Sequence, residues 1–332
     1  MTKFRLATAL AGWILLAASA CAAPTAEEVF PAEPDPLMGN YVGRWSADVE
    51  VAPNSAGQVI ALGGDLYRVI LVNELDMRCP KLMDIELKAK NGVIEFDQRP
   101  YSGKIDGKTF VGGRGKGDAS FTMQKVERLS PTLGKSAPQG ATVLFDGKNL
   151  DAWTDTKGWQ ILPDGTLMVT PDGEYIVSKG TWKDLEIHVE FRTPFMPRSS
   201  GQQRGNSGVF IQDVYEVQIL DSFGLEGYYD ECGALYRLSA PHVNACAPPL
   251  QWQTFDITYR APRYDASGKL TENGRMTVLL NGVLVHNDQE LKWITAWTEA
   301  DRMMPPPKDP GHIKLQGHNN FVQFRNIWLV EK

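Results

Sequence analysis

Residues 274–287 read GRMTVLLNGVLVHN and contain the clearest turn signal in the chain. Apolar runs stand on both sides of Asn281-Gly282, with no other residue between them. An Asn-Gly pair in this setting is typical of a two-residue type I′ turn, because both positions of that turn require a positive φ. The stretch therefore predicts a β-hairpin and places antiparallel strands in this part of the chain.

Short apolar runs of similar length recur on both sides of this hairpin, at intervals of about 8–15 residues. They include TLMVT, DLEIHVEFRT, SGVFIQ, YEVQIL, QTFDITYR and FVQFRNIWLVEK, and long amphipathic helices are scarce. This spacing predicts an all-β protein in which residues 142–332 form a β-sandwich. Residues 37–130 hold further alternating runs separated by Gly, Asn and Asp, which predicts a smaller antiparallel β-domain ahead of the sandwich.

Two segments outside these domains have the composition of connections. Residues 21–36 are rich in Pro, Ala and Glu, which predicts a flexible tether. Residues 131–141 are rich in Ser, Pro and Gly, which predicts a linker between the two domains.

The chain begins with a pattern that is typical of export. A short basic region precedes an apolar run over residues 6–17, which is shorter than the roughly 20 residues that a membrane-spanning helix needs. Small residues at 18–20 provide a cleavage site, so residues 1–20 are predicted to be a signal peptide. Cys21 resembles the lipid-modified cysteine of a bacterial lipoprotein, but Ala18 replaces the usual leucine, and ordinary cleavage is the alternative. The mature protein is then periplasmic or anchored to the outer membrane, with the lipid as its sole membrane contact.

The composition is typical of a folded soluble protein, with 42% apolar and 22% charged residues. A net charge of −6, without a Lys/Arg cluster, gives no reason to expect nucleic acid as a partner. Nine Trp and ten Tyr supply flat apolar faces, which exported proteins use both in their cores and as platforms for sugar rings.

In an oxidising compartment, the cysteines that follow Cys21 are candidates for a disulfide bond. Cys232 and Cys246 bracket a short loop and are the candidate pair, while Cys79 could compete for either of them. The alternative is that all three are reduced and buried. The sequence has no C-x-x-C pair that would indicate structural zinc.

Residues 215–222, YEVQILDS, carry the candidate catalytic face. Alternation along a strand places Glu216 and Gln218 on one face and apolar residues on the other, and the apolar face meets the partner sheet. The polar face is then either a solvated outer surface or the wall of a sugar-binding cleft. Asp221 has the opposite parity, and a bulge near Ser222 would re-aim it toward the same face.

Several motifs follow one another in the second half of the chain, namely VLFDGKNLDAW, DLEIHVEFRT, GNSGVFIQ, YEVQILDS, GALYRLSAP, QWQTFDITYR, VLLNGVLV and GHIKLQGHNNFVQFRNIWL. In this order they resemble the 3-keto-disaccharide hydrolase domain family over residues 143–331. The resemblance implies a concanavalin-A-like jelly-roll sandwich. QVIALGG, residues 58–64, resembles a companion module that precedes some members and has no activity assigned to it. The loops at 193–205, 241–250 and 294–311 depart from the family's pattern and would reshape a cleft.

The resemblance implies an exported hydrolase or lyase that acts on 3-keto-glycosides. A ketone at C3 makes the C2 proton acidic, so a carboxylate base can remove it. The glycosidic oxygen then leaves from C1 by elimination, and water adds back to complete a net hydrolysis. Glu216 is the expected base, and Asn206, His318 or Gln218 is expected to donate to the enolate oxygen, with a divalent cation as the alternative. The implied partner is an oligosaccharide or another glycoside.

Three further residues are candidate contacts to the substrate. Tyr236 is either a sugar contact or a core ring. Glu186 and His188 share a strand face with Glu190, and this face is either a second polar wall of the cleft or a solvated outer surface. Arg325 is expected to form an ion pair that closes the sandwich.

Two other functions fit the same fold. One is a carbohydrate-binding module without turnover, because jelly rolls often bind sugars passively. The other is a conventional glycosidase in which Glu216 and either Asp221 or Glu186 form the carboxylate pair. The sequence has no clear E-x-D-x-x-E element, since Gln218 stands at its middle acidic position. This departure favours chemistry that needs a single base.

Overall fold

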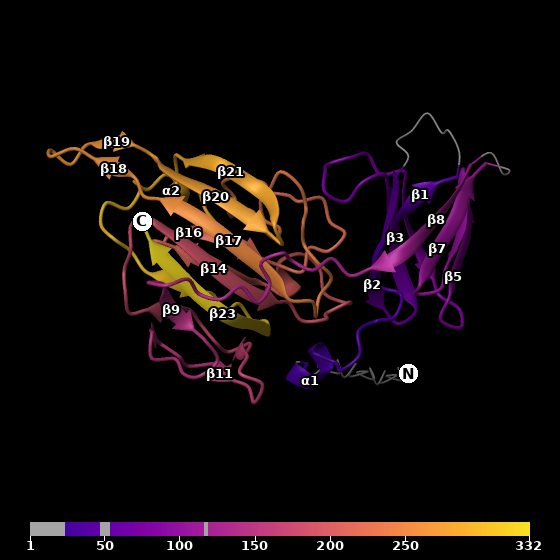
Figure 1. Ribbon diagram of the computed structural model, residues 1–332, viewed down its shortest axis with the longest axis horizontal. Coiled ribbons are helices and arrows are strands. Elements are labelled where there is room, and N and C mark those ends of the chain that lie inside the picture. Colours follow the sequence, from indigo (N-terminus) through magenta and orange to yellow (C-terminus); the bar gives the residue numbers. More distant parts are fainter. Residues whose placement is uncertain (1–23, 47–53, 116–118) are drawn as a thin grey trace, which may run out of the picture.

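The computed structural model describes residues 24–46, 54–115 and 119–332, which form two β-domains side by side (Figure 1). The predicted signal peptide and Cys21 lie outside the described residues. Within these ranges, no helix is long and apolar enough to cross a membrane. The helical elements are short, namely α1 (Ala26–Val29), α2 (Glu299–Arg302) and a 3-10 turn (Gly201–Gln203).

The N-terminal domain is a single antiparallel sheet in the order β4-β3-β2-β1-β8-β7-β6-β5. Two four-strand meanders meet where β8 pairs with β1. The eight strands are β1 (Gly39–Trp45), β2 (Asn54–Gly63), β3 (Leu66–Val72), β4 (Met83–Lys88), β5 (Ile94–Gln98), β6 (Tyr101–Ile105), β7 (Thr109–Arg114) and β8 (Ala119–Val126). The predicted small antiparallel β-domain is confirmed.

The C-terminal domain is a sandwich of two antiparallel sheets. The five-stranded sheet has the order β10 (Trp153–Thr154), β13 (Ile176–Ser178), β22 (Ile313–Leu315), β15 (Ser207–Ile211) and β16 (Tyr215–Ile219). The second sheet has the order β11 (Trp159–Ile161), β12 (Leu167–Val169), β23 (Val322–Glu331), β14 (Leu185–Arg192), β17 (Gln253–Arg260), β20 (Gly274–Leu280) and β21 (Val283–Leu291). In addition, β9 (Thr142–Phe145) pairs with β23, and β18 (Arg263–Tyr264) pairs with β19 (Leu270–Glu272). The predicted all-β jelly-roll architecture is confirmed.

The hairpin of β20 and β21 has the predicted two-residue turn. Leu280 pairs with Val283, and the residues between them, Asn281 and Gly282, have φ of 54° and 78°. Both values are positive, as a type I′ turn requires. A Cβ on Gly282 would lie 2.5 Å from the ring of Pro131, so the turn also makes room for the linker to pass.

One core joins the two sheets of the sandwich. Tyr215, Val217 and Ile219 of β16 are fully buried, and they share a hydrophobic cluster with Ile187 and Val189 of β14. Alternation therefore turns the apolar faces of both strands inward, as the sequence pattern predicts. The polar residues between them point away from this core, from opposite sides of the sandwich.

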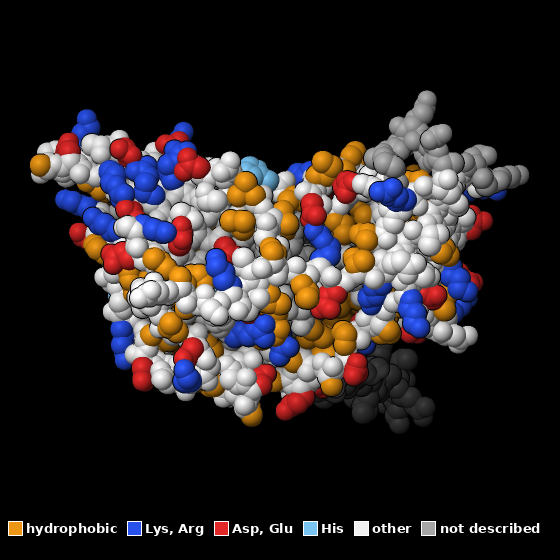
Figure 2. Space-filling view, in the orientation of Figure 1, with side chains coloured by type: hydrophobic (Ala, Val, Ile, Leu, Met, Phe, Trp, Pro, Cys, Tyr) orange, Lys and Arg blue, Asp and Glu red, His pale blue; other side chains and the backbone are white. Residues whose placement is uncertain are grey.

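The two domains share an extensive boundary. Phe223 of the C-terminal domain is 2% exposed and packs into the core cluster of the N-terminal domain. A Cβ on the next residue, Gly224, would lie 2.5 Å from Ile60 Cδ1 on β2, so the chains approach too closely for a side chain. On the face shown in Figure 2, hydrophobic side chains gather at this junction, where the domains and the leader border a cavity of about 960 Å³.

Arg78 fastens the N-terminal domain to a loop of the C-terminal domain. Its guanidinium donates to the carbonyl oxygens of Glu226 at 2.9 Å, Pro241 at 2.9 Å and His242 at 3.0 Å, and also to that of Gly227. Because one guanidinium binds four backbone carbonyl oxygens of the loop, it fixes the path of the loop. Residues 226–242 therefore take part of their support from the other domain.

The described part of the leader packs against the protein, although residues 21–36 are predicted to be a flexible tether. Thr25 forms a capping box at the start of α1, and Val29 is only 4% exposed. The carbonyl oxygen of Val29 accepts the backbone N–H of Phe195 at 2.7 Å. The buried Val29 side chain and this backbone hydrogen bond hold the segment against the protein. Its Pro- and Glu-rich composition did not predict this packing.

Candidate functional site

Glu216 and Gln218 point outward from β16, yet both are buried, with 6% and 1% exposure. Residues 233–236 run along the free edge of this strand and pair with it. Gln218 exchanges backbone hydrogen bonds of 2.9 Å with Ala234 and Gly233, and Tyr236 N donates to Glu216 O at 3.1 Å. The polar face of β16 is therefore buried, and the predicted alternative of a solvated outer surface is wrong.

The Glu216 carboxyl group has no hydrogen bond or ion pair from the described residues. Burial without a compensating charge raises its pKa to about 8. Gly208, which pairs with Gln218 on the neighbouring strand, leaves room for the Glu216 carboxyl group, because a Cβ at this position would collide with it. Burial raises the pKa of Tyr236, the Arg237 charge opposes that rise, and the Glu216 charge adds to it.

An amide cluster adjoins Glu216. Gln202, in the 3-10 turn, accepts at Oε1 from Gln218 Nε2 at 3.0 Å and from Asn206 Nδ2 at 3.1 Å. Asn206 Nδ2 also donates to the Gln202 carbonyl oxygen at 2.9 Å. The structure thus joins two predicted site residues, Asn206 and Gln218, through a third that the sequence analysis missed.

Two buried amide oxygens at this face have no hydrogen-bond donor from the protein. They are Gln218 Oε1 and Gln316 Oε1. Gln316 belongs to the same face, because its backbone N–H donates to Gly208 O at 3.0 Å, and its Nε2 donates to Tyr175 Oη at 3.0 Å. Buried acceptors without donors are costly, so a ligand that carries hydroxyl groups would satisfy them.

His318 lies at the edge of this cluster on the loop after β22. Asn320 ties the loop to the turn before β15: its side chain donates to His318 O at 3.0 Å and accepts from Gly205 N at 2.7 Å. The imidazole is half-buried and makes no hydrogen bond with the described residues. Asn320 thus holds the His318 loop beside Gly205, the residue before Asn206, and the His318 ring is free to bind a ligand.

Asp221 does not join the Glu216 face. It is 2% exposed and bonded to Arg204 Nε at 2.6 Å, and it borders a cavity of about 570 Å³ at the domain junction. Burial raises its pKa, and the Arg204 charge opposes that rise. The expected bulge does not re-aim the carboxylate toward Glu216, because the ion pair holds it at the junction.

Glu186 and His188 lie on the opposite side of the sandwich from Glu216. The intervening residue Ile187 points into the core, so both side chains project from the outer face of the other sheet. Glu186 forms a surface ion pair with Lys332 at 3.0 Å. The prediction that Glu186 and His188 form a second wall of the same cleft is wrong, because the whole sandwich separates them from Glu216.

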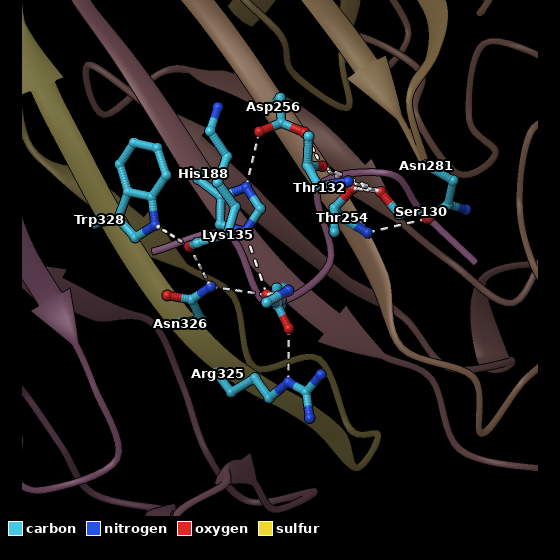
Figure 3. A network of polar contacts seen from close by, with 12 residues as sticks. Ser130, Thr132, Lys135, His188, Thr254, Asp256, Asn281, Arg325, Asn326 and Trp328 are labelled. Carbon is cyan, nitrogen blue, oxygen red and sulfur yellow. Dashed lines mark hydrogen bonds and ion pairs between the residues drawn. The ribbon is translucent and has the colours of Figure 1, made fainter. Parts of the chain in front are cut away.

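His188 is not solvated either, because the linker covers it (Figure 3). Its Nδ1 lies 2.8 Å from Asp256 Oδ1, and its ring stacks on Trp328 at 5.1 Å. Burial opposes the imidazolium, but the bonds to Asp256 and Glu190 outweigh it and raise the pKa of His188. Thr132 of the linker donates to the other oxygen of Asp256 at 2.6 Å.

Glu190 completes this network beside His188. It accepts from Gly134 N at 2.6 Å, Asn326 Nδ2 at 2.8 Å and Arg325 Nε at 2.6 Å. Burial opposes its charge, but these bonds and His188 lower the pKa of Glu190 to about 2. The predicted ion pair of Arg325 is confirmed, and the network has a structural role: it fastens residues 131–141 to the sheet.

The cysteines contradict the prediction of a disulfide bond. Cys232 and Cys246 are buried free thiols, so the predicted disulfide between them is not formed. They are neighbours, because a hydrogen bond with Cys232, together with burial, raises the pKa of Cys246. Cys79 is also a free thiol and donates to Glu74 O at 3.3 Å. For metals, the described residues contain no group of three or more His, Cys, Asp or Glu side chains that could hold an ion.

Known proteins resemble the C-terminal domain. Residues 140–330 match the family described as a 3-keto-alpha-glucoside-1,2-lyase-like domain. A predicted glycosyl hydrolase from Parabacteroides distasonis is 35% identical, with 59% of this chain and 86% of that chain covered and a TM-score of 0.54. A second one from the same organism is 24% identical, with 58% and 99% covered and a TM-score of 0.43. No curated protein matches the chain at a significant level.

The two-sheet fold, the family match and the 35% identical structure support a carbohydrate-active β-sandwich of the hydrolase class. The chain belongs to the 3-keto-alpha-glucoside-1,2-lyase-like family, and the match spans the C-terminal domain. The resemblance drawn from the motifs is thereby confirmed. The N-terminal domain lies outside the matched residues.

Proposed function

We propose that this protein is an exported enzyme that cleaves 3-keto-glycosides, with Glu216 as the base that removes the C2 proton. The observation that carries the proposal is the Glu216 carboxyl group, which is buried, unpaired and raised in pKa to about 8. A general base is most effective when its pKa lies near the working pH, and about 10²–10⁴-fold of rate is typical for such a group.

The proposed reaction has two stages. Glu216 takes the proton from C2, and the electron pair of the C2–H bond forms the enolate with the C3 ketone. The enolate then re-forms the ketone as the C1–O bond breaks, which leaves a double bond between C1 and C2. The leaving oxygen takes a proton from water, the hydroxide so formed adds to C1, and Glu216 returns its proton to C2. The sum is a hydrolysis in which nothing is oxidised or reduced.

Gln218 is the best candidate to donate to the enolate oxygen. Its amide gives one N–H to Gln202 and keeps the other free. Asn206 uses its Nδ2 for two contacts with Gln202, so it is more suited to fixing Gln202 in position. His318 is the second candidate donor, because its ring has no partner in the described residues. A preorganised donor of this kind contributes roughly 10²–10³-fold in other enzymes.

The sugar itself would satisfy the remaining polar groups of this face. The unpaired oxygens of Gln218 and Gln316 are acceptors, and sugar hydroxyl groups are donors. Tyr236 would contact the same ring, because it lies beside the Glu216 carboxyl group. A conventional carboxylate pair is a weaker candidate, because Glu186 lies on the other sheet and Asp221 is held by Arg204.

The test compares a disaccharide with its 3-keto form. Purified protein should cleave the 3-keto form, and Glu216→Gln should lose turnover while it retains binding. Cleavage of the unoxidised disaccharide alone would reject the elimination mechanism, and binding without cleavage by the unaltered protein would favour a carbohydrate-binding module. Export is tested separately, by locating the protein in cell fractions and by asking whether Cys21→Ser releases it from the membrane.

A further inference from the structure

Arg237, directly after Tyr236, adopts a backbone conformation that is unusual for its residue type. Its φ is 56°, in the left-handed region that a long L side chain rarely occupies. Its backbone N–H donates to Tyr229 O at 2.7 Å, which fixes this conformation. Such strain persists where the surrounding structure imposes it, and it is common at ligand-binding sites.

The Arg237 guanidinium lies among aromatic rings. Its Cζ lies 3.8 Å from the centroid of the Trp297 ring and 5.9 Å from that of Tyr229. Nη1 donates to Trp297 O at 3.2 Å. Nε is buried and has no hydrogen-bond partner, and the described residues supply no carboxylate to this guanidinium. The group is therefore oriented and still has an N–H to donate.

Two of the rings around Arg237 are largely exposed. Trp297 is 62% exposed and Tyr229 is 49% exposed, whereas Tyr236 is 8% exposed. Large aromatic rings rarely gather on a surface without a binding role, and their flat faces suit the apolar face of a pyranose ring. The cluster thus offers both a stacking surface and a fixed donor.

This cluster is attached to the backbone of Glu216 from two sides. Tyr236, next to Arg237, donates to Glu216 O, and Thr295, two residues before Trp297, accepts from Glu216 N at 2.8 Å. The cluster therefore begins at residues that are hydrogen-bonded to the backbone of Glu216, beside the strand that carries the proposed base.

We propose that Arg237, Trp297 and Tyr229 form the subsite for the leaving group, and that the leaving group is a second sugar ring rather than a short alkyl chain. This inference rests on the proposed function of Glu216. The ring stacks on the exposed aromatic faces, and one of its hydroxyl oxygens accepts from Arg237 Nε. An alkyl leaving group would leave that donor unpaired and the aromatic faces in water.

The experiment compares two substrates with different leaving groups: a 3-keto-glucosyl-glucose disaccharide and methyl 3-keto-glucoside. For Trp297→Ala we expect kcat/KM to fall about tenfold with the disaccharide and by less than twofold with the methyl glycoside, because the lost contact involves the leaving ring alone. Arg237→Lys keeps the charge but loses the planar group, and should show the same selective loss. An equal loss with both substrates, or no loss with either, would overturn the proposal.

Two controls separate this inference from the proposed function. Met77→Ala removes an equally exposed side chain, 58% exposed, from the other domain, and should change neither rate. Calorimetric binding of the 3-keto-disaccharide to Glu216→Gln, with and without Trp297→Ala, tests the subsite without turnover. If the unaltered protein cleaves neither substrate, the proposed function fails, and a contribution of Trp297 to binding would then mark a sugar-binding site without a leaving group. If Glu216→Gln binds the disaccharide no more tightly than the methyl glycoside, the subsite is wrong.

Discussion

The isolated Glu216 carboxyl group should make the stability of the protein fall as pH rises. Its pKa is about 8 in the folded protein, against 4.5 for an unperturbed glutamate. Between these values the folded state keeps the proton and the unfolded state releases it, so the free energy of unfolding decreases through this window. At 1.36 kcal/mol per pKa unit, the shift corresponds to about 5 kcal/mol of lost stability above pH 8.

Glu216→Gln removes the charge and keeps the shape, so the variant should lose this pH dependence. We expect it to match the unaltered protein near pH 4.5 and to exceed it by about 5 kcal/mol at pH 9, the full linkage value. The assay is urea unfolding of both proteins at pH 5, 7 and 9. Glu95→Gln, at an exposed ion pair with Lys104, is the matched control and should run parallel to the unaltered protein.

A constant difference between Glu216→Gln and the unaltered protein at all three pH values would refute this reasoning. It would mean that the carboxyl group ionises in the folded state as it does in water, so that burial does not act on it. The same pKa predicts a pH dependence for the proposed reaction. If Glu216 is the base, it must be deprotonated, so kcat/KM measured across this pH range should rise as pH approaches 8 and level off above it.

Three further predictions concern residues away from Glu216. Arg78→Ala removes the bonds to backbone carbonyls across the domain boundary, and calorimetric unfolding should separate into two transitions; a single unchanged transition would contradict this role. Glu190, with its pKa of about 2, contributes about 3 kcal/mol that is present above pH 4.5 and lost as pH falls toward 2, so the acid limb of the urea-unfolding stability profile should be shallower in Glu190→Gln. Denatured protein beginning at residue 24 should react with three equivalents of a thiol reagent, through Cys79, Cys232 and Cys246, and a count of one would show that a disulfide forms after all.

Local patterns in the sequence predict the strands and the turn well. The Asn281-Gly282 pair specifies its own turn, because both residues tolerate a positive φ. The alternation of β16 correctly separates the core residues from Glu216 and Gln218. These features depend on neighbours within a few residues, which a sequence displays directly.

Features that depend on distant segments could not be predicted in this way. The outer face of β16 is buried in the folded chain, and Gln202 belongs to the site through its contacts with Gln218 and Asn206. His188, like Glu216, points to the outer face of its strand. It is buried under a linker whose composition predicts a flexible connection. Period-two patterns tell which side of a sheet a residue occupies, and give no information on what lies above it.

The attachment of residues 131–141 bears on any attempt to produce the jelly roll by itself. A fragment that starts at the first strand of the sandwich would lack Thr132 and Gly134, and it would expose Asp256, His188 and Glu190 to water with some of their partners missing. Such a fragment should aggregate or unfold at lower temperature than one that begins at Ser130. The boundary for excision therefore lies a dozen residues upstream of where the strand pattern would put it, and the connector is best regarded as an outer layer of the catalytic module.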